Sequence, residues 1–269
     1  APGATSYNQP GGYYNVTVEA TNTAGTTGSA DASTLEGLKF YVEERVAPVI
    51  TILSPSDGAY VSNNQQPVVF TVTDESGGSG VDLDSVAVRL DGTAVSAAEV
   101  THTAITNGYS FTYTPSGAMG DGAHTVSVEA ADNDGNAAAA KSTTFTVDTV
   151  PPALNVTSPA EGLVTATAAL AVSGTTNDAT SSPVVITVTL NSADQGPVTV
   201  QANGSFSKTV TLAEGANTIV VTATDAAGKV STVTRNVTLD TSVPQIVSAG
   251  ITPNPADAGA TVTITVVVQ

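Results

Sequence analysis

The feature that most constrains the fold is a segment that occurs three times and ends each time in a glycine turn. The copies are GYYNVTVEATNTAG from Gly12, GAHTVSVEAADNDG from Gly122 and GANTIVVTATDAAG from Gly215. Within each copy apolar and polar residues alternate, which is the pattern of a β-strand with one buried face. The turn that follows predicts a hairpin. A repeat at roughly 100 residues predicts several small β-domains.

A second repeated landmark predicts where these domains end. An acidic residue is followed four positions later by proline, which fixes φ and cannot donate a hydrogen bond to a sheet. The three occurrences are Glu44/Pro48, Asp148/Pro152 and Asp240/Pro244. They divide the chain into two complete domains, 46–148 and 149–240, flanked by the last part of a preceding domain, 1–45, and the start of a further one, 241–269. We therefore expect a piece of a longer array.

Short β-branched runs between turn signals predict the strands of both complete domains. In the first they are Val49–Leu53, Val68–Thr73, Val86–Leu90, Ser110–Thr114, Thr125–Ala130 and Thr143–Val147. In the second they are Leu170–Ser173, Val184–Leu190, Pro197–Gln201, Ser205–Leu212, Thr218–Thr224 and Thr232–Leu239. No segment has a helical period, so we predict Greek-key β-sandwiches with essentially no helix. Alternation predicts that Val126, Val128, Ile219 and Val221 are buried, whereas Ser127 and Val220 face the other side.

Composition excludes several classes of function. The chain has 24 acidic and 7 basic residues, a net charge of −17, no Cys and two His. A nucleic-acid partner is excluded because phosphates require clustered Lys and Arg. Membrane insertion is excluded because no apolar run approaches the roughly 20 residues of a span. Without thiols, and with so little histidine, most catalytic and transition-metal sites are also excluded, and we predict a protein that is not an enzyme.

The linker DTVPPALNVTSPAEG and the hairpin GANTIVVTATDAAG resemble those of tandem bacterial Ig-like domains of extracellular and surface proteins. The stretch from Leu154 to Asp240 is similar to the glucodextranase B-type Ig-like module. Together these resemblances cover nearly the whole chain. They imply an all-β fold of tandem immunoglobulin-like Greek-key β-sandwiches and an extracellular or cell-surface location. They do not specify an activity.

Ig sandwiches often place a tyrosine near the start of strand F, where its hydroxyl bonds back to the preceding corner. The three repeated segments have Tyr14, His124 and Asn217 at that position. We therefore interpret His124 as a structural corner residue rather than a general base. His102 lies in a threonine-rich run and is expected at the surface.

Calcium is the cofactor that the distribution of acids favours, because hard cations bind several carboxylate oxygens on turns. In Ig topology the B–C and F–G loops lie at the pole where the chain enters from the preceding domain. The candidate ligands are Glu44, Asp74, Asp132 and Asp134 at the first junction, and Asp148 and Asp225, beside Asn177 and Asp178, at the second. The alternative is that these acids only make turns, since Asn22–Gly25 closes the same hairpin without an acid.

Short linkers and acidic surfaces favour a spacer or stalk in a secreted or cell-surface repeat protein, with an adhesive or surface-structural role. Its partners would be neighbouring Ig-like repeats and other cell-surface proteins or glycans. One alternative is an accessory module of an extracellular carbohydrate-active enzyme. Another is a subunit of a surface filament or layer. A weak glycan site involving Tyr60, Tyr109 and Tyr113 is also open, because strand alternation can turn these rings partly outward.

Overall fold

The computed structural model describes residues 6–8 and 12–269. The chain divides into two units, the first built mainly from residues before Pro151 and the second mainly from the remainder. Strands dominate both units. Within the described residues, the helical segments are two 3-10 turns, η1 (Glu36–Leu38) and η2 (Ala97–Glu99). None of the described helices has the length and apolarity of a membrane span.

The first unit opens with two small antiparallel pairs. Strand β1 (Tyr13–Asn15) pairs with β4 (Lys39–Tyr41), and β2 (Val18–Thr21) pairs with β3 (Thr27–Ala30). The turn between β2 and β3 is closed by Asn22, whose side-chain oxygen accepts the N–H groups of Ala24 and Thr26. This Asx turn satisfies the backbone without any carboxylate.

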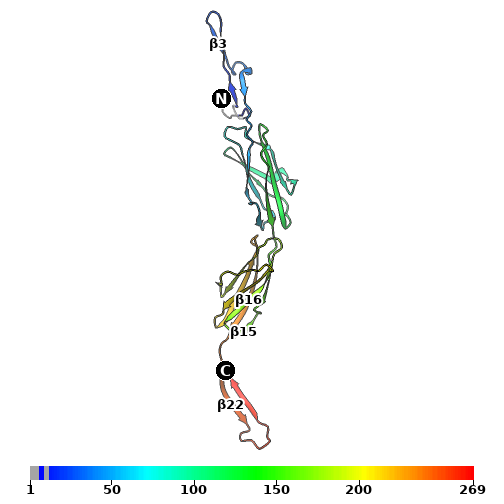
Figure 1. Ribbon diagram of the computed structural model, residues 1–269, viewed down its shortest axis with the longest axis vertical. Coiled ribbons are helices and arrows are strands. Elements are labelled where there is room, and N and C mark those ends of the chain that lie inside the picture. Colours follow the sequence, from blue (N-terminus) through cyan, green and yellow to red (C-terminus); the bar gives the residue numbers. More distant parts are fainter. Residues whose placement is uncertain (1–5, 9–11) are drawn as a thin grey trace. The chain divides into compact units, whose positions relative to one another are not determined.

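A two-sheet sandwich follows in the same unit, the first sandwich (cyan to green in Figure 1). One sheet has the order β10-β11-β7-β5 and the other β6-β13-β12-β8-β9. The strands are β5 (Val49–Ser54), β6 (Ala59–Val61), β7 (Val68–Thr73), β8 (Val81–Leu90), β9 (Thr93–Ala94), β10 (Val100–Ile105), β11 (Gly108–Tyr113), β12 (Gly122–Asp132) and β13 (Lys141–Val147). All neighbours are antiparallel except β6 and β13, which run parallel.

The core of the first sandwich lies between its two sheets. Phe70 and Phe111 stack with ring centroids 5.0 Å apart. The predicted burial of Val126 and Val128 on β12 is confirmed, since neither is accessible to solvent, and the intervening Ser127 is only partly buried. The alternation seen in the sequence therefore defines the core face of this strand.

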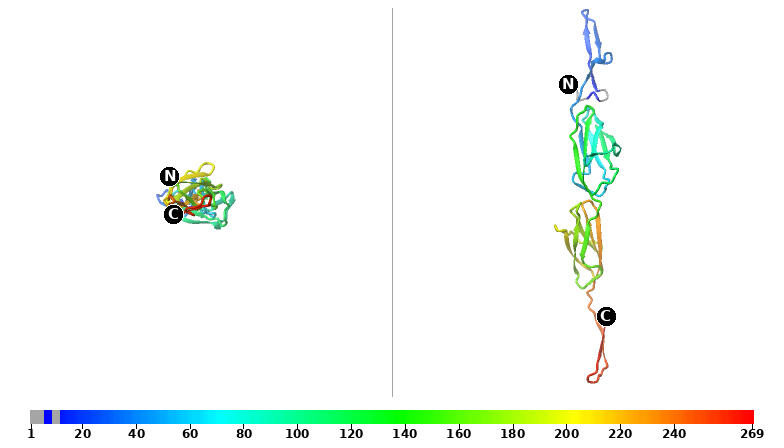
Figure 2. Two further views of the ribbon diagram at one scale, coloured as in Figure 1. Left: turned by 90° about the horizontal axis from the view of Figure 1, so that it is seen from below. Right: turned by 90° about the vertical axis from the view of Figure 1, so that its right-hand side faces the viewer.

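The second unit contains a matching sandwich, the second sandwich, seen between the green and orange colours in Figure 2. Its sheets have the orders β14-β16-β19 and β15-β21-β20-β17-β18. The strands are β14 (Ala153–Ser158), β15 (Leu163–Thr165), β16 (Ala169–Asn177), β17 (Val185–Leu190), β18 (Ala193–Asp194), β19 (Ser205–Thr211), β20 (Gly215–Thr224) and β21 (Val230–Leu239). Ile219 and Val221 are fully buried, as predicted. A separate hairpin of β22 (Ile246–Thr252) and β23 (Thr263–Val268) follows.

Several strands differ from the sequence prediction. The expected strand Pro197–Gln201 is wrong: this segment makes only an isolated bridge, between Val200 and Phe206. Pro197 lacks the N–H that a ladder requires. The prediction also missed β14, and it gave β10 only as a threonine-rich strand that contains His102. It missed β6 and β15 too, which are three-residue strands pairing in parallel at a sheet edge and too short to show a period.

His124 occupies the structural corner position that the sequence indicated. Its Nε2 lies 2.8 Å from the Gly120 carbonyl and its Nδ1 lies 2.8 Å from Asp91 Oδ2. Asp91 also accepts the Thr125 N–H through Oδ1. The second sandwich makes the same corner without charge: Asn191 accepts the Thr218 N–H and donates to Asn217.

The corner of the first sandwich forms an ion pair when His124 is protonated. Burial acts to lower the pKa of His124, but its contacts with the Gly120 carbonyl and Asp91 outweigh burial and raise that pKa. Burial acts to raise the pKa of Asp91, but hydrogen bonds from the Thr125 N–H and from His124 outweigh it and lower that pKa.

We predict that this pair makes the stability of the first sandwich depend on pH. The His124 contribution is present below the ordinary histidine pKa and is lost as pH rises through the raised value. The Asp91 contribution is present above the ordinary aspartate pKa and is lost as pH falls through the lowered value. The pair is therefore strongest between about pH 4 and 6.5. Because Asp91 is half exposed, the loss on raising the pH to about 8.5 should be only about 0.5 kcal/mol.

The measurement is thermal melting of the wild type and of Asp91→Asn, each at a pH between about 4 and 6.5 and again at about pH 8.5. Asparagine suits the turn, because Asn191 has φ 50° where Asp91 has φ 49°. The wild type should lose stability between the two pH values relative to Asp91→Asn. Parallel pH profiles for the two proteins would show that the pair contributes nothing.

Candidate metal centre

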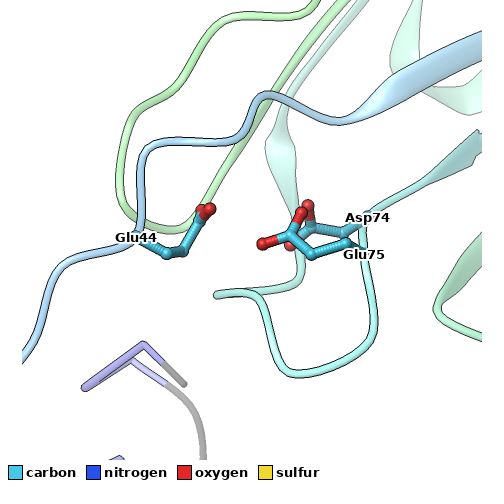
Figure 3. A group of neighbouring side chains, drawn as sticks. All are labelled: Glu44, Asp74 and Glu75. Atoms are coloured by element: carbon cyan, nitrogen blue, oxygen red, sulfur yellow. The ribbon is translucent and has the colours of Figure 1, made fainter. Parts of the chain in front are cut away.

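Three acidic side chains converge at the end of the first sandwich where the chain enters from β4. Asp74 and Glu75 follow directly after β7, in the loop that leads to β8. Glu44 comes from the segment between β4 and β5. Figure 3 shows the carboxylate of Glu44 facing those of Asp74 and Glu75. One carboxylate oxygen from each residue lies within 4.8 Å of the other two. We call this group the Glu44–Asp74–Glu75 cluster.

Backbone and amide groups orient Glu44 toward this cluster. Its Oε2 accepts the Val46 N–H at 2.8 Å, and its Oε1 accepts the Asn136 side-chain amide at 3.0 Å. The Ser79 hydroxyl donates to Oε1 over a longer 3.4 Å. The position of the carboxylate is thus set by three different segments of the first unit.

Asp74 is held at one oxygen only. Its Oδ2 accepts the Gly80 N–H at 2.7 Å, and its backbone N–H donates to the Asn107 carbonyl. Asp74 is 7% exposed, and its Oδ1 is buried without a hydrogen-bond partner among the described residues. Both carboxylate oxygens of Glu75 are likewise buried without a hydrogen-bond partner among the described residues. Buried oxygens without donors are rare, because each loses its hydration without replacement.

The loop itself is shaped around these carboxylates. A Cβ atom on Gly78 would lie 2.6 Å from Asp74 Oδ2 and 2.6 Å from Glu75 Oε1. Gly77 and Gly80 have φ of 93° and 81°, values that favour glycine. The glycine-rich sequence therefore lets the backbone fold closely over two acids.

The electrostatics of the cluster reflect burial beside like charges. Burial raises the pKa of Glu75 to about 7, and the contact with Asp74 adds to the rise. Burial also raises the pKa of Glu44, and its contact with Asp132 acts in the same direction. Neither the Lys39–Glu36 pair nor the His124–Asp91 pair involves these acids. The cluster therefore has an excess of negative charge that no described side chain neutralises.

The two remaining acids predicted at the first junction have other partners. Asp132 accepts both the backbone N–H and the side-chain amide of Asn136, each at 2.8 Å. Burial acts to raise the pKa of Asp132, but its hydrogen bonds with Asn136 and Glu44 outweigh burial and lower that pKa. Asp132 therefore supports Glu44 through the side-chain amide of Asn136, which donates to both carboxylates.

Asp134 ties the N-terminal segment to the first sandwich. Its Oδ2 accepts the Ser6 hydroxyl at 2.6 Å and the Glu44 N–H at 2.9 Å, and its Oδ1 accepts the side-chain amide of Asn8. Its own N–H donates to the Ser79 hydroxyl. Both oxygens are thus occupied by hydrogen bonds, and Asp134 lies outside the Glu44–Asp74–Glu75 cluster.

The residues predicted at the second junction belong to both units. Asp148, after β13, is buried and accepts the Val150 N–H and the Ser181 hydroxyl. In the second unit, Asp225 follows β20 and is buried, and one of its carboxylate oxygens lies within 4.8 Å of an oxygen of Asp178. Their role as calcium ligands stays a prediction.

Glu75 is the residue of the cluster that the sequence prediction missed. Asp74 and Glu75 are adjacent, and adjacent side chains on a continuing strand point to opposite faces. Strand β7 ends at Thr73, however, and the chain turns, so both carboxylates point to the same side. The run of glycines after Glu75 was the available signal for such a turn.

The three tyrosines considered for a glycan site differ in their exposure to solvent. Tyr113 is 2% exposed, so its expected outward orientation is wrong. It shares the inward face of β11 with Phe111. Tyr109 packs partly against the same core, and Tyr60 remains exposed. His102 is at the surface, with its ring edge-on to Tyr109 at 5.4 Å.

Two family models match the chain, one in each sandwich. Residues 47–149 match the family model described as bacterial Ig-like domain, and residues 152–241 match glucodextranase, domain B. The two sandwiches are tandem Ig-like domains. No curated protein sequence matches the chain. Proteins of the Ig-like and fibronectin-like families are generally non-catalytic.

Solved structures with similar folds include tandem modules from several sources. The fibronectin(III)-like modules of Clostridium thermocellum CbhA are 18% identical, with 71% of this chain and 94% of that chain covered and a TM-score of 0.46. A 1.5-MDa bacterial ice-binding adhesin is 24% identical, with 83% and 74% covered and a TM-score of 0.30. The titin Ig tandem A164–A165 is 9% identical, with 72% and 98% covered and a TM-score of 0.27.

We predict that Asp134→Ala detaches the N-terminal segment from the first sandwich without unfolding the sandwich. The change removes acceptors for Ser6, Asn8 and the Glu44 N–H. A hydrogen bond to a charged group contributes about 1.5–3 kcal/mol, so the Glu44 amide should exchange with solvent at least about tenfold faster.

Hydrogen exchange resolved by residue or short peptide measures this effect. Asp84→Ala removes an exposed acid of β8 and is the matched control. Unchanged exchange at Glu44 in Asp134→Ala would contradict the assigned role, and so would an equal acceleration in the control.

Proposed function

We propose that this chain is a non-catalytic spacer segment of a secreted or cell-surface bacterial protein, which presents or links other domains. The observation that supports it best is the tandem arrangement of two complete Ig-like sandwiches with little chain between them. Strand β13 ends at Val147 and β14 begins at Ala153, so only residues 148–152 connect the two folds. Two of these residues, Pro151 and Pro152, are prolines.

Local bonding supports a stiff connection. The carboxylate of Asp148 accepts the Val150 N–H, and Asp121 accepts both the N–H and the hydroxyl of Thr149. Pro152 is buried and its carbonyl accepts the Ser231 hydroxyl. A linker fixed at both ends has few conformations to lose, and proline narrows them further.

The negative charge of the chain supports a spacer whose copies do not associate with one another. A net charge of −17 makes copies of the chain repel one another and protects edge strands from pairing between molecules. Both histidines have structural surroundings: His124 closes a corner, and His102 packs on aromatic rings.

We predict that lengthening the linker loosens the tandem. Insertion of Gly-Ser-Gly-Ser after Val150 should broaden the distribution of interdomain distances in small-angle X-ray scattering, because the constrained linker gains flexible residues. The same insertion after Ser116, in an exposed loop of the first sandwich, should leave that distribution unchanged. A wild-type chain whose scattering already requires a broad ensemble would argue against a spacer that sets distance.

An accessory module of an extracellular carbohydrate-active enzyme is the second candidate. It is favoured by the match of residues 152–241 to glucodextranase domain B. Electrophoresis through gels that contain soluble glucans separates the two candidates. Retardation by a glucan favours the accessory module, whereas unchanged mobility across the panel favours the spacer.

Assembly into a surface filament has one observation in its favour. The hairpin of β22 and β23 has apolar residues on one face, and Ile251, Ile264 and Val266 are all exposed. Sedimentation that depends on protein concentration would favour assembly. A monomer at all concentrations would favour the spacer.

A further inference from the structure

We propose that the Glu44–Asp74–Glu75 cluster is a calcium site, and that the bound ion fastens the segment before β5 to the loop between β7 and β8. This inference does not depend on the spacer role. It narrows the ligand set expected at the first junction, because Glu75 enters it and both Asp132 and Asp134 leave it.

The buried oxygens without donors point to a ligand. Asp74 is 7% exposed and accepts one hydrogen bond through Oδ2, while Oδ1 is buried with no donor among the described residues. Figure 3 shows its carboxylate on the side of Glu44. Both oxygens of Glu75 are buried without a donor as well. A cation supplies what these three atoms lack, since it replaces hydration and neutralises the mutual repulsion.

The chemistry of the donors selects a hard cation. The three ligands are carboxylates, and neither His nor Cys belongs to the group. Calcium binds oxygen at about 2.3–2.6 Å, so two ligands of one ion can be up to about 5 Å apart. The carboxylate oxygens of the cluster, all within 4.8 Å of one another, satisfy this limit.

The surroundings hold the ligands in place and leave an approach from solvent. Asn136 donates to both Glu44 and Asp132, and Val46 fixes the other oxygen of Glu44. Such second contacts orient ligands and increase affinity. A surface groove lined by Asp74, Glu75 and Asn133 provides access for the ion and for the waters that complete its coordination.

Calcium binding therefore joins two parts of the first unit that are far apart in sequence. Glu44 precedes the first sandwich, whereas Asp74 and Glu75 belong to its loop. An ion bound by both stabilises the assembled state by mass action. The ion acts beside the hydrogen bonds of Asp134, which hold the same segment without metal.

The test is titration of the whole chain with calcium chloride, followed by calorimetry and by hydrogen exchange of residues 74–80. We expect a dissociation constant on the order of 10⁻⁴–10⁻³ M, the range of extracellular calcium modules. At tenfold excess over this constant, the melting temperature of the first sandwich should rise by roughly 5 °C relative to chelator. Exchange in residues 74–80 should slow about tenfold. Magnesium at the same concentration should have a much smaller effect, because it dehydrates reluctantly.

Glu75→Gln is the principal variant, since it keeps the shape and removes one charge. It should melt higher than the wild type in chelator, because repulsion is relieved, and it should lose at least tenfold in calcium affinity. Asp84→Asn removes an equal charge outside the cluster and should keep the wild-type response. Gly78→Ala, which pushes a methyl group between the two loop carboxylates, should also weaken binding, with Gly117→Ala as its control.

Any of three results would overturn the proposal. One is the absence of calcium-dependent heat and of protection in residues 74–80 up to about 10 mM calcium, well above the expected range. Another is a calcium response of residues 74–80 that is the same in Glu75→Gln and in the wild type. A response confined to other parts of the chain would equally reject this site, because hydrogen exchange reports on the loop itself.

Discussion

Each sandwich is held together by the contact of two apolar sheet faces, and the positions of all its loops depend on that contact. The chain has no cysteine, so no disulfide joins the sheets. In the first sandwich the stacked rings of Phe70 and Phe111 belong to one sheet, and Val126 and Val128 of the same core belong to the other. This packing places the ends of β7 and β12 at the same pole, and the acidic loops begin there. The loops are therefore positioned by the apolar core rather than by their own interactions.

The rest of the sandwich buries apolar side chains, whereas the Glu44–Asp74–Glu75 cluster buries carboxylates close together. Burial of several carboxylates close together opposes folding, and the raised pKa of Glu75 is one sign of that opposition. Sequences usually break local rules where a site requires it. The same loop shows a second departure, because three of its residues are glycines, and at Gly78 a Cβ atom would clash with both acids.

Much of this structure could be predicted from alternation, because alternation reports which face of a strand is buried. Val126, Val128, Ile219 and Val221 were identified in this way. The misses have physical causes. Tyr113 shares its inward face with Phe111, although alternation allowed an outward ring. The expected strand at 197–201 makes only an isolated bridge, and its first residue, Pro197, has no N–H to donate. The parallel edge strands β6 and β15 are too short to have a period.

The candidate site was less predictable than the fold, because side chains converge there only after the chain has left its strands. Loop topology was sufficient to bring Glu44 and Asp74 together, since strand ends determine where loops begin. The role of Asp134 was not predictable, because it depends on Ser6 and Asn8, which are distant in sequence. Glu75 required knowledge of the turn after β7.

The two sandwiches show how one frame accommodates different chemistry. At the corner after β8, Asp91 pairs with His124. At the corner after β17, Asn191 pairs with Asn217 through the same backbone geometry. The hydrogen bond to the strand is kept in both, while the charge is present in only one. The fold therefore requires an acceptor at this turn but not a carboxylate. Whether this position carries a charge therefore differs between the two sandwiches, although the fold is shared. Function has to be sought in the loops of each sandwich and not in the shared fold.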